Sequence, residues 1–179
     1  MSEIKTTEKG NNIVLIGLSG SGKTTIGKEL SNLLKRPFID TDELLEEVIG
    51  SSVLAYFKAY GEQEFRKLEN QLLETLNPDD GAVIATGGGM PCYGESMDGL
   101  LKLGTVIYLS VSIDEISARI LKDVAKRPLY RDMSLQAVKQ KTKALLEQRE
   151  SDYLKADRIL DANPDAEKVL KVLLPSLKD

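Results

Sequence analysis

The chain has 179 residues, of which 41% are hydrophobic and 29% are charged, so it is long enough for one globular domain with a substantial core. The formal net charge is −4 without any long block of lysine and arginine, which argues against nucleic acid as a partner. The absence of histidine excludes histidine-based zinc sites, histidine general bases and Ser-His-Asp triads.

Residues 1–12 are polar and lack periodicity, which predicts a flexible tail ahead of a single domain over residues 13–179. No charged and apolar leader opens the chain, and no run of about 18 apolar residues follows, so we expect no association with a membrane. The single cysteine, Cys92, excludes an intrachain disulfide and suits a cytoplasmic protein. We expect it to be a buried or half-buried thiol without a role.

The first apolar run, Ile13–Gly17, predicts a strand, and the spacing of apolar residues predicts a helix over Lys23–Leu34. Between them, Gly17–Thr24 fits the phosphate-binding pattern G-x-x-x-x-G-K-[ST]. Glycines let several backbone N–H groups point at one anion, and the helix N-terminus adds the positive end of its dipole. We therefore predict nucleotide binding, with Lys23 at the outer phosphates and Thr24 as a ligand of Mg²⁺. An ordinary glycine-rich turn is the alternative.

Residues 37–39 predict a short second strand that leads into Asp40 and Asp42. On an extended backbone, residues two apart point the same way, so both carboxylates can face one cavity. Beside a phosphate-binding loop, one suits the shell of Mg²⁺ and the other suits a substrate hydroxyl. The alternative is an Asx turn or a cap of the following helix.

Apolar spacing predicts two short helices over residues 44–49 and 53–59, and Gly61 precedes a longer helix over residues 62–76. Arg66 lies in this longer helix, with Glu62 and Glu69 at helical spacing beside it. Such charges are commonly ion pairs on a solvent-exposed face, which is the alternative to a binding role.

The run Ala82–Thr86 predicts a strand that is buried on both faces of a sheet, and Gly87, Gly88 and Gly89 follow it. Glycines without side chains let a ligand ring approach the backbone amides. A flexible bend without a ligand is the alternative.

The C-terminal half continues the alternation of helices and strands. We expect a helix over residues 95–103, a strand over 105–110, a helix from the capping box at Ser112 to Lys122, and a charged loop over 122–133. A long helix over residues 134–151, a strand over 158–160 and a last helix that starts at Asn163 and Pro164 follow. This order predicts an α/β fold, a three-layer α/β/α sandwich with a parallel sheet, whose ligands bind at the carboxyl ends of the strands.

Four motifs, in this order, resemble those of the shikimate kinase family. They are Phe38–Asp42, Phe57-x-x-x-Gly61-Glu62-x-x-Phe65-Arg66-x-x-Glu69, the three glycines, and Arg127-Pro128-Leu129. The resemblance implies a monomeric enzyme that uses ATP to phosphorylate the 3-hydroxyl of shikimate, on the pathway to chorismate and aromatic amino acids. It also implies a five-stranded parallel sheet of order 2-3-1-4-5, as in nucleoside monophosphate kinases.

The resemblance further implies the roles of single residues. Phosphate binding would fall to the loop residues Gly20, Ser21, Gly22, Lys23, Thr24 and Thr25. Shikimate would contact Asp42, Arg66, Gly87, Gly88, Gly89 and Arg149, and the substrate-binding helices would span about residues 41–76. Mg²⁺ would be held by Thr24 and Asp40. Arg119 and Pro164 would flank adenine, and the catalytic residues would be Lys23, Asp42 and Arg127.

Arg127 belongs to the charged loop over residues 122–133, which also holds Lys122, Lys126 and Arg131. We expect this loop to be a lid that closes over ATP and excludes water, and a plain solvated loop is its alternative.

Two other functions fit parts of the sequence. A gluconate kinase of the same architecture would also bind a carboxylate and hydroxyls, but the motif from Gly61 to Glu69 and the three glycines favour shikimate. A nucleotide-dependent switch or a non-catalytic relative is the other, although no N-K-x-D motif occurs and Lys23, Asp40, Asp42 and Arg127 are all present.

Overall fold

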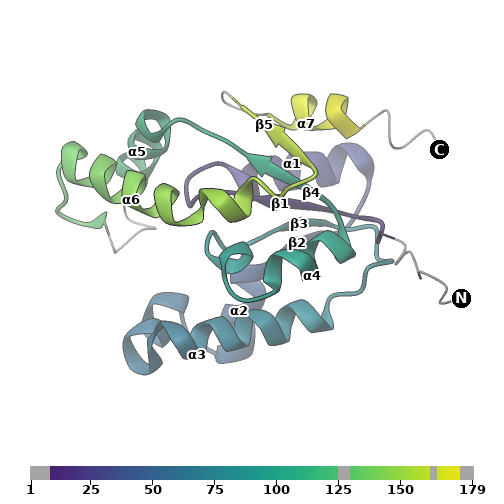
Figure 1. Cartoon of the computed structure of the whole chain (residues 1–179), viewed down its shortest axis with the longest axis horizontal. Coiled ribbons are helices and arrows are strands. Elements are labelled where there is room, and N and C mark those ends of the chain that lie inside the picture. Colours follow the sequence, from purple (N-terminus) through teal and green to yellow (C-terminus); the bar gives the residue numbers. More distant parts are fainter. Residues whose placement is uncertain (1–8, 125–129, 162–164, 174–179) are drawn as a thin grey trace, which may run out of the picture.

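The computed structural model describes residues 9–124, 130–161 and 165–173, and a parallel five-stranded sheet lies at its centre (Figure 1). The strands run in the order β2-β3-β1-β4-β5, which confirms the predicted topology. The strands are β1 (Asn12–Ile16), β2 (Phe38–Asp40), β3 (Val83–Ala85), β4 (Gly104–Leu109) and β5 (Arg158–Leu160). The helices are α1 (Lys23–Leu34), α2 (Thr41–Ile49), α3 (Val53–Thr75), α4 (Ser96–Leu103), α5 (Ile113–Lys122), α6 (Leu135–Tyr153) and α7 (Ala166–Leu173), with a 3₁₀ turn, η1, over Met90–Cys92.

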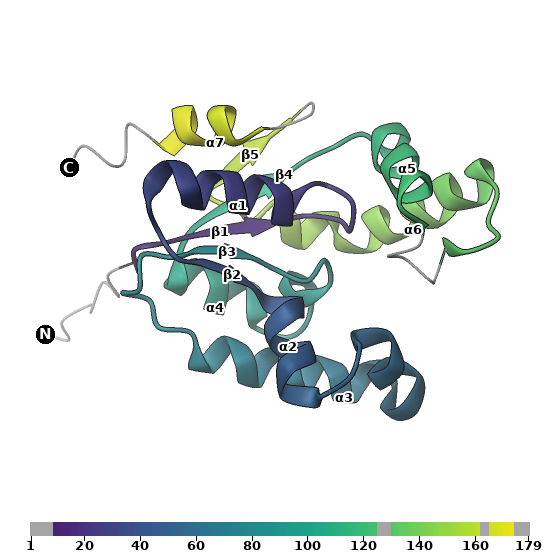
Figure 2. The ribbon, with the colours of Figure 1, turned by 180° about the vertical axis from the view of Figure 1, so that it is seen from behind.

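The central strand β1 is buried on both faces, and its side chains divide the core into two layers. Ile13 and Leu15 pack with residues of α1 and α7, whereas Val14 and Ile16 pack with residues of α3, α4, α5 and α6. This alternation follows from the two-residue period of a strand, and it gives the three layers that the sequence predicts. Figure 2 shows α1 and α7 on one side of the sheet and α4 on the other.

Asn12 holds together the edge of the sheet that is remote from the carboxyl ends of the strands. Its buried side-chain amide donates to the carbonyl oxygens of Asn77 (3.0 Å), Pro78 (3.3 Å) and Leu103 (3.0 Å), and its Oδ1 accepts from the N–H of Ala82 (2.7 Å). Gly10 and Asn11 are also hydrogen-bonded to the domain. Residues 9–12, which we predicted as part of a flexible tail, therefore contact the fold, and the rest of that predicted tail lies outside the described residues.

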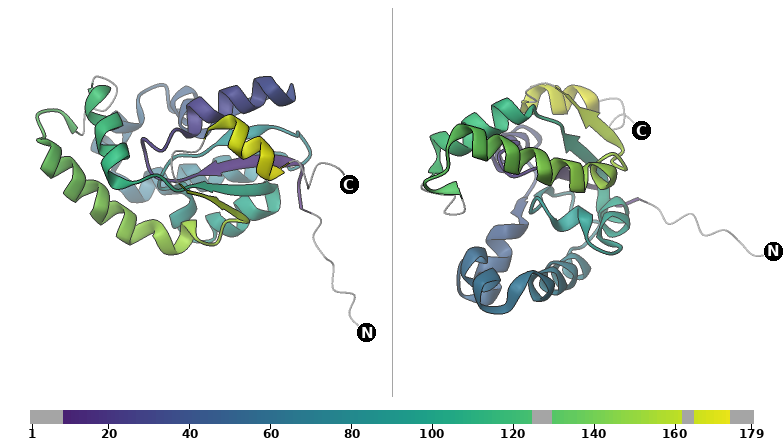
Figure 3. Two further views of the ribbon diagram at one scale, coloured as in Figure 1. Left: turned by 90° about the horizontal axis from the view of Figure 1, so that it is seen from above. Right: turned by 60° about the vertical axis from the view of Figure 1, so that its left-hand side comes forward.

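The α2–α3 segment extends from the sheet beside the phosphate-binding loop, and α5 and α6 lie on the other side of that loop (Figure 3). Gly61 interrupts α3 with φ 81° and ψ 172°, a conformation that is almost restricted to glycine. The break that the sequence indicates at Gly61 is therefore present, and it divides α3 into two helical parts that meet at a kink. Helix α2 starts three residues earlier than we expected, at Thr41.

The C-terminal helices follow the predicted order with small shifts of their ends. Ser112 and Ser134 cap α5 and α6 by accepting from the N–H groups of Glu115 and Ala137. Helix α6 continues to Tyr153, two residues beyond the predicted end. Residues 125–129 of the predicted lid, which include Lys126 and Arg127, and the predicted helix start at Asn163 and Pro164 lie outside the described residues. Among the described helices, none combines the length and apolar character needed to cross a bilayer.

Candidate active site

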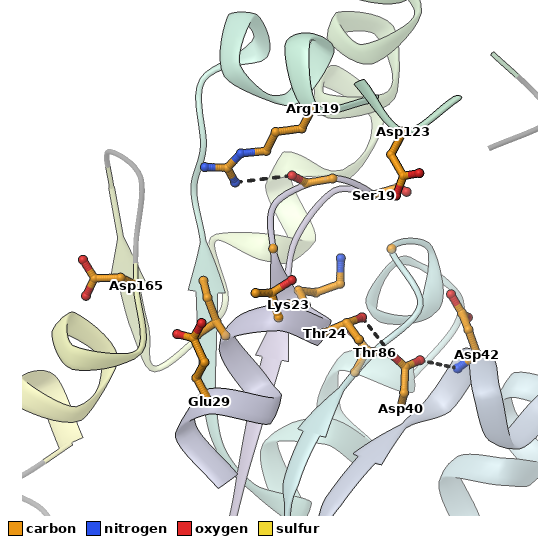
Figure 4. A pocket seen from close by; sticks show the side chains of 15 residues that line it. Ser19, Lys23, Thr24, Glu29, Asp40, Asp42, Thr86, Arg119, Asp123 and Asp165 are labelled. Carbon is orange, nitrogen blue, oxygen red and sulfur yellow. Dashed lines mark hydrogen bonds between the residues drawn. The ribbon is translucent and has the colours of Figure 1, made fainter. Parts of the chain in front are cut away.

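A cavity of about 530 Å³ opens at the carboxyl ends of β1, β2 and β3 (Figure 4). Its wall brings together residues from the phosphate-binding loop, the two aspartates and the first half of the glycine loop. The lining residues are Ser19, Gly20, Gly22, Lys23, Thr24, Thr25, Ile26, Glu29, Asp40, Asp42, Thr86, Gly88, Arg119, Asp123 and Asp165. The cavity therefore combines predicted nucleotide ligands with predicted substrate ligands.

The phosphate-binding loop needs its glycines for backbone geometry. Gly17, Gly20 and Gly22 have φ of 141°, 91° and 100°, which L-residues with side chains rarely adopt. The Lys23 ammonium folds back over the loop and donates to the carbonyl oxygens of Gly17 (2.8 Å) and Leu18 (2.9 Å). The lysine is thus held at the mouth of the loop, where phosphate oxygens can become its acceptors.

Asp40 links the starts of two helices. Its Oδ2 accepts from the Thr24 hydroxyl at 2.7 Å, and its Oδ1 accepts from the N–H groups of Asp42 (3.0 Å) and Glu43 (3.4 Å), so it is the N-cap of α2 (Figure 4). Asp42 consequently lies in the first helical turn. The expectation that both aspartates project from an extended strand is wrong, because capping by Asp40 starts the helix at Thr41. Both side chains nevertheless line the same cavity.

Asp42 lies between positive groups at the two ends of the site. Its side chain remains accessible from the cavity, but partial removal from water raises the pKa of its carboxyl group, and the charge of Asp40 raises that pKa further. The charges of Lys23 and Arg66 oppose this rise. Asp42 is therefore near both the phosphate loop and the arginine of α3.

Arg66 and Glu69 form a buried ion pair rather than a solvated face, which overturns the alternative interpretation for this pair. Nη1 of Arg66 lies 2.5 Å from Oε2 of Glu69, and Nη2 lies 2.8 Å from Oε1 of the more exposed Glu62. Burial raises the pKa of the Glu69 carboxyl group, and the charge of Arg66 opposes that rise. The guanidinium group is thus fixed from two sides, and one face of it remains next to the glycine loop.

The three glycines pack directly against the charged residues of the site. A Cβ on Gly87 would lie 2.6 Å from Oδ1 of Asp42 and 3.0 Å from Oε1 of Glu69, and a Cβ on Gly89 would overlap the guanidinium group of Arg66. A Cβ on Gly88 would lie 3.1 Å from the N atom of Ser19. A side chain at Gly87 or Gly89 would therefore displace the charged groups of Asp42 or Arg66, so the glycines let these groups approach the backbone of the loop.

Arg149 approaches the same place from α6. Its Nη1 lies 3.6 Å from the position of a Cβ on Gly88, and its charge acts on the carboxyl group of Glu69. The thiol of Cys92 donates to the carbonyl oxygen of Arg149 across 3.9 Å. Arg66 and Arg149, which are far apart in sequence, thus lie on two sides of the glycine loop.

Of the three other residues predicted to bind the nucleotide, the described part of the chain contains Arg119. Arg119 lies on the cavity wall, where Nη1 donates to the carbonyl oxygens of Gly20 (3.5 Å) and Ser21 (3.3 Å) and Nε pairs with Glu115 (2.9 Å). Arg127 and Pro164 lie outside the described residues.

The sequence model of the shikimate kinase family matches residues 19–178. The chain belongs to the shikimate kinase family. A shikimate kinase of Helicobacter hepaticus is 41% identical over 157 residues, which covers 87% of both chains. One from Clostridium botulinum strain Okra is 37% identical over 163 residues, 90% of this chain and 94% of its own. The structure of the Acinetobacter baumannii shikimate kinase in complex with shikimate is 32% identical, with a TM-score of 0.82 over 96% of this chain and 95% of that chain.

Membership of the shikimate kinase family makes the chain a phosphotransferase that uses ATP to phosphorylate shikimate. This result confirms the resemblance stated from the motifs and favours shikimate over gluconate as the acceptor.

Two residues that contact predicted site residues in the structure were not themselves predicted as site residues from the sequence. Glu69 occurs within a recognised motif, and its position three residues after Arg66 was the available signal for a paired carboxylate. Tyr153 gave no signal, because its neighbour Gly88 is 65 residues away in the chain.

Proposed function

We propose that the cavity binds the phosphates of ATP over the glycine-rich loop, while Arg66 and Arg149 bind the carboxylate of shikimate and Asp42 binds the hydroxyl that is phosphorylated. The single observation that carries this assignment is the place of Asp42. Its side chain lines the cavity together with Lys23, and at Gly87 it lies beside Glu69, the ion-pair partner of Arg66. Shikimate that spans from Asp42 to the arginines presents its 3-hydroxyl to the nucleotide side of the cavity.

Phosphoryl transfer passes through a loose transition state, so positioning and neutralisation of charge do most of the work. Lys23 neutralises charge on the outer phosphates, and the backbone N–H groups of Gly20, Gly22 and Thr24 hold them in place. In this proposal Arg119 and Pro164 flank the adenine, and Arg127 brings a further positive charge when residues 122–133 close over the nucleotide. The position of Arg119 on the cavity wall supports its part.

Thr24 and Asp40 would hold Mg²⁺. Their oxygens lie 2.7 Å apart on the cavity wall, and hydroxyl and carboxylate oxygens are ligands that Mg²⁺ prefers. Mg²⁺ in such sites is commonly bound by one or two protein groups together with substrate phosphates and water. When bound, the ion offsets negative charge on the phosphates.

The planar guanidinium groups of Arg66 and Arg149 suit a carboxylate, because each can donate two parallel hydrogen bonds. Asp42 orients the acceptor hydroxyl and takes its proton late, since a loose transition state needs little deprotonation beforehand. The raised pKa of Asp42 brings its carboxyl group closer to this task than an ordinary surface aspartate.

We extend the proposal to a cytoplasmic monomer that needs no nucleic-acid partner. The net charge of −4 supports the last point, and the single half-buried cysteine suits a reducing compartment.

The test is an assay of ADP release with shikimate, with gluconate and without an acceptor, followed by ³¹P NMR of the product. We expect ADP release that depends on shikimate, and a phosphate ester on the 3-hydroxyl. Equal ADP release without an acceptor, or a preference for gluconate, would reject the proposed function.

A further inference from the structure

The hydroxyl group of Tyr153 connects two parts of the site that come from different ends of the chain. Tyr153 is the last residue of α6 and is fully buried, yet its hydroxyl donates to the carbonyl oxygen of Gly88 at 2.5 Å. This contact joins the helix that carries Arg149 to the glycine loop after β3. The proposed mechanism assigns no role to this contact.

Arg149 lies one helical turn before Tyr153, so both side chains are on the same face of α6. Burial raises the pKa of Tyr153, which keeps its phenol group protonated as a donor, and the neighbouring Arg149 opposes that rise by its charge and by hydrogen bonding. The phenol oxygen therefore contacts the peptide of Gly88, and Nη1 of Arg149 lies beside the same glycine, 3.6 Å from the position of a Cβ.

The contact with Gly88 sets the direction of a whole peptide unit. In a trans peptide the C=O of Gly88 and the N–H of Gly89 point in opposite directions, and no cis peptide occurs in the described chain. A carbonyl that points at Tyr153 therefore directs the N–H of Gly89 away from α6. Within the described residues, the N–H groups of Gly88 and Gly89 donate to no protein acceptor, so they are available to a ligand.

The ring of Tyr153 is fixed by the sheet. It packs on Tyr108 of β4 with ring centroids 5.0 Å apart, and Tyr108 is itself buried among the residues of that core layer. The hydroxyl is thus attached to the rigid centre of the protein and not to a surface loop, which is the arrangement that precise positioning requires.

We propose that Tyr153 is a positioning residue for the carboxylic acid substrate, because its hydroxyl fixes Arg149 and the peptide between Gly88 and Gly89 relative to each other. The inference rests on the proposed function, which assigns Arg149 and the glycine loop to shikimate. The rival explanation is a structural role, in which the carbonyl oxygen of Gly88 only supplies a hydrogen-bond acceptor for the buried hydroxyl of Tyr153.

The test compares Tyr153→Phe with Tyr108→Phe. Both variants keep an aromatic ring in the same pair and lose one hydroxyl, but of these two hydroxyls the one on Tyr153 donates to Gly88. We expect Tyr153→Phe to raise the KM for shikimate about tenfold, with the KM for ATP within about twofold of the parent. Tyr108→Phe should leave both constants unchanged. Equal shikimate KM values in the two variants, or a parallel rise of both KM values in Tyr153→Phe, would overturn the proposal.

A double-mutant cycle with Arg149→Ala separates this inference from the proposed function. If Tyr153 acts through Arg149 and the loop, Tyr153→Phe should raise the shikimate KM much less in the Arg149→Ala background than in the parent. Additive effects would overturn the positioning role while the substrate site stands. A shikimate KM that Arg149→Ala leaves unchanged would reject the assignment of Arg149 itself, and the inference with it.

Discussion

Arg66 and Glu69 form an ion pair inside the protein, with 2.5 Å between Nη1 of the arginine and Oε2 of the glutamate. The arginine is one helical turn beyond the break at Gly61, and its guanidinium group packs against Gly89. The guanidinium group is held by two carboxylates beside Gly89, which has no side chain. It is therefore preorganised to bind a carboxylate, because little side-chain entropy remains to be lost on binding.

Arg66→Ala should impair shikimate binding far more than ATP binding. Removal of one partner of a buried charge pair typically costs about 2–5 kcal/mol, which corresponds to a roughly 30- to several-thousand-fold rise in the KM for shikimate. Lys67→Ala is the matched control, since Lys67 is the next residue, is exposed and pairs only with Glu64 among the described salt bridges. Steady-state kinetics with each substrate varied would check this, and an unchanged shikimate KM in Arg66→Ala would remove Arg66 from the site.

The contribution of the Arg66–Glu69 pair to the free energy of unfolding should be separable from its contribution to shikimate binding. Arg66→Ala leaves the Glu69 carboxylate, which is 2% exposed, without its nearest cation and should lower the free energy of unfolding by about 3 kcal/mol. The apolar double variant Arg66→Met/Glu69→Leu removes both charges and should return to within about 1 kcal/mol of the parent, while shikimate binding stays lost. Urea denaturation measures this, and a double variant less stable than Arg66→Ala would contradict it.

Asp42→Asn should abolish most activity and change how stability depends on pH. The pKa of Asp42 in the folded protein is above its ordinary value of 3.8, so over that interval the folded state keeps a proton that the unfolded chain has released. The free energy of unfolding therefore falls as pH rises through the interval, and Asp42→Asn should remove that part of the fall. Urea denaturation from about pH 3.5 to about pH 8 would check this against Asp79→Asn, an exposed turn position. Parallel curves for parent and Asp42→Asn would show that Asp42 does not contribute.

Cys92 should react slowly with alkylating reagents in the folded protein. Burial raises the pKa of its thiol to about 11, and the nearby Arg149 only partly opposes this. Because the thiolate is the reactive form, its fraction near pH 8 is roughly a thousandth, and alkylation should accelerate as pH approaches about 11. Mass spectrometry after iodoacetamide treatment measures the rate, with the urea-unfolded chain as control. Equal rates in folded and unfolded protein near pH 8 would contradict the expectation.

The fold and the identity of the phosphate loop followed from local patterns. The run before Gly17, the loop glycines and the helix after Lys23 each depend on neighbouring residues, so the sequence suffices to predict them. The order of the strands in the sheet rests on the family resemblance, because periodicity along the sequence does not show which strands are neighbours.

Contacts between distant residues could not be predicted in this way. The sequence places Glu69 beside Arg66 but does not tell whether the pair faces water or the core, since that depends on how α3 packs. Asn12 reads as part of a polar tail, although its amide joins three separate segments. Asp40 and Asp42 were expected on one strand face, and the capping bond that places Asp42 in a helix depends on backbone geometry that spacing does not show.

Asp40 connects the helix that follows the phosphate-binding loop to the helix that carries Asp42. One of its oxygens meets the hydroxyl at the start of α1, and the other meets the amides at the start of α2. In the proposed function α1 lies beside ATP and α2 lies beside shikimate, so a single carboxylate holds the starts of both helices together. If the two substrates bind as proposed, this one carboxylate couples the position of the phosphate-binding loop to that of Asp42.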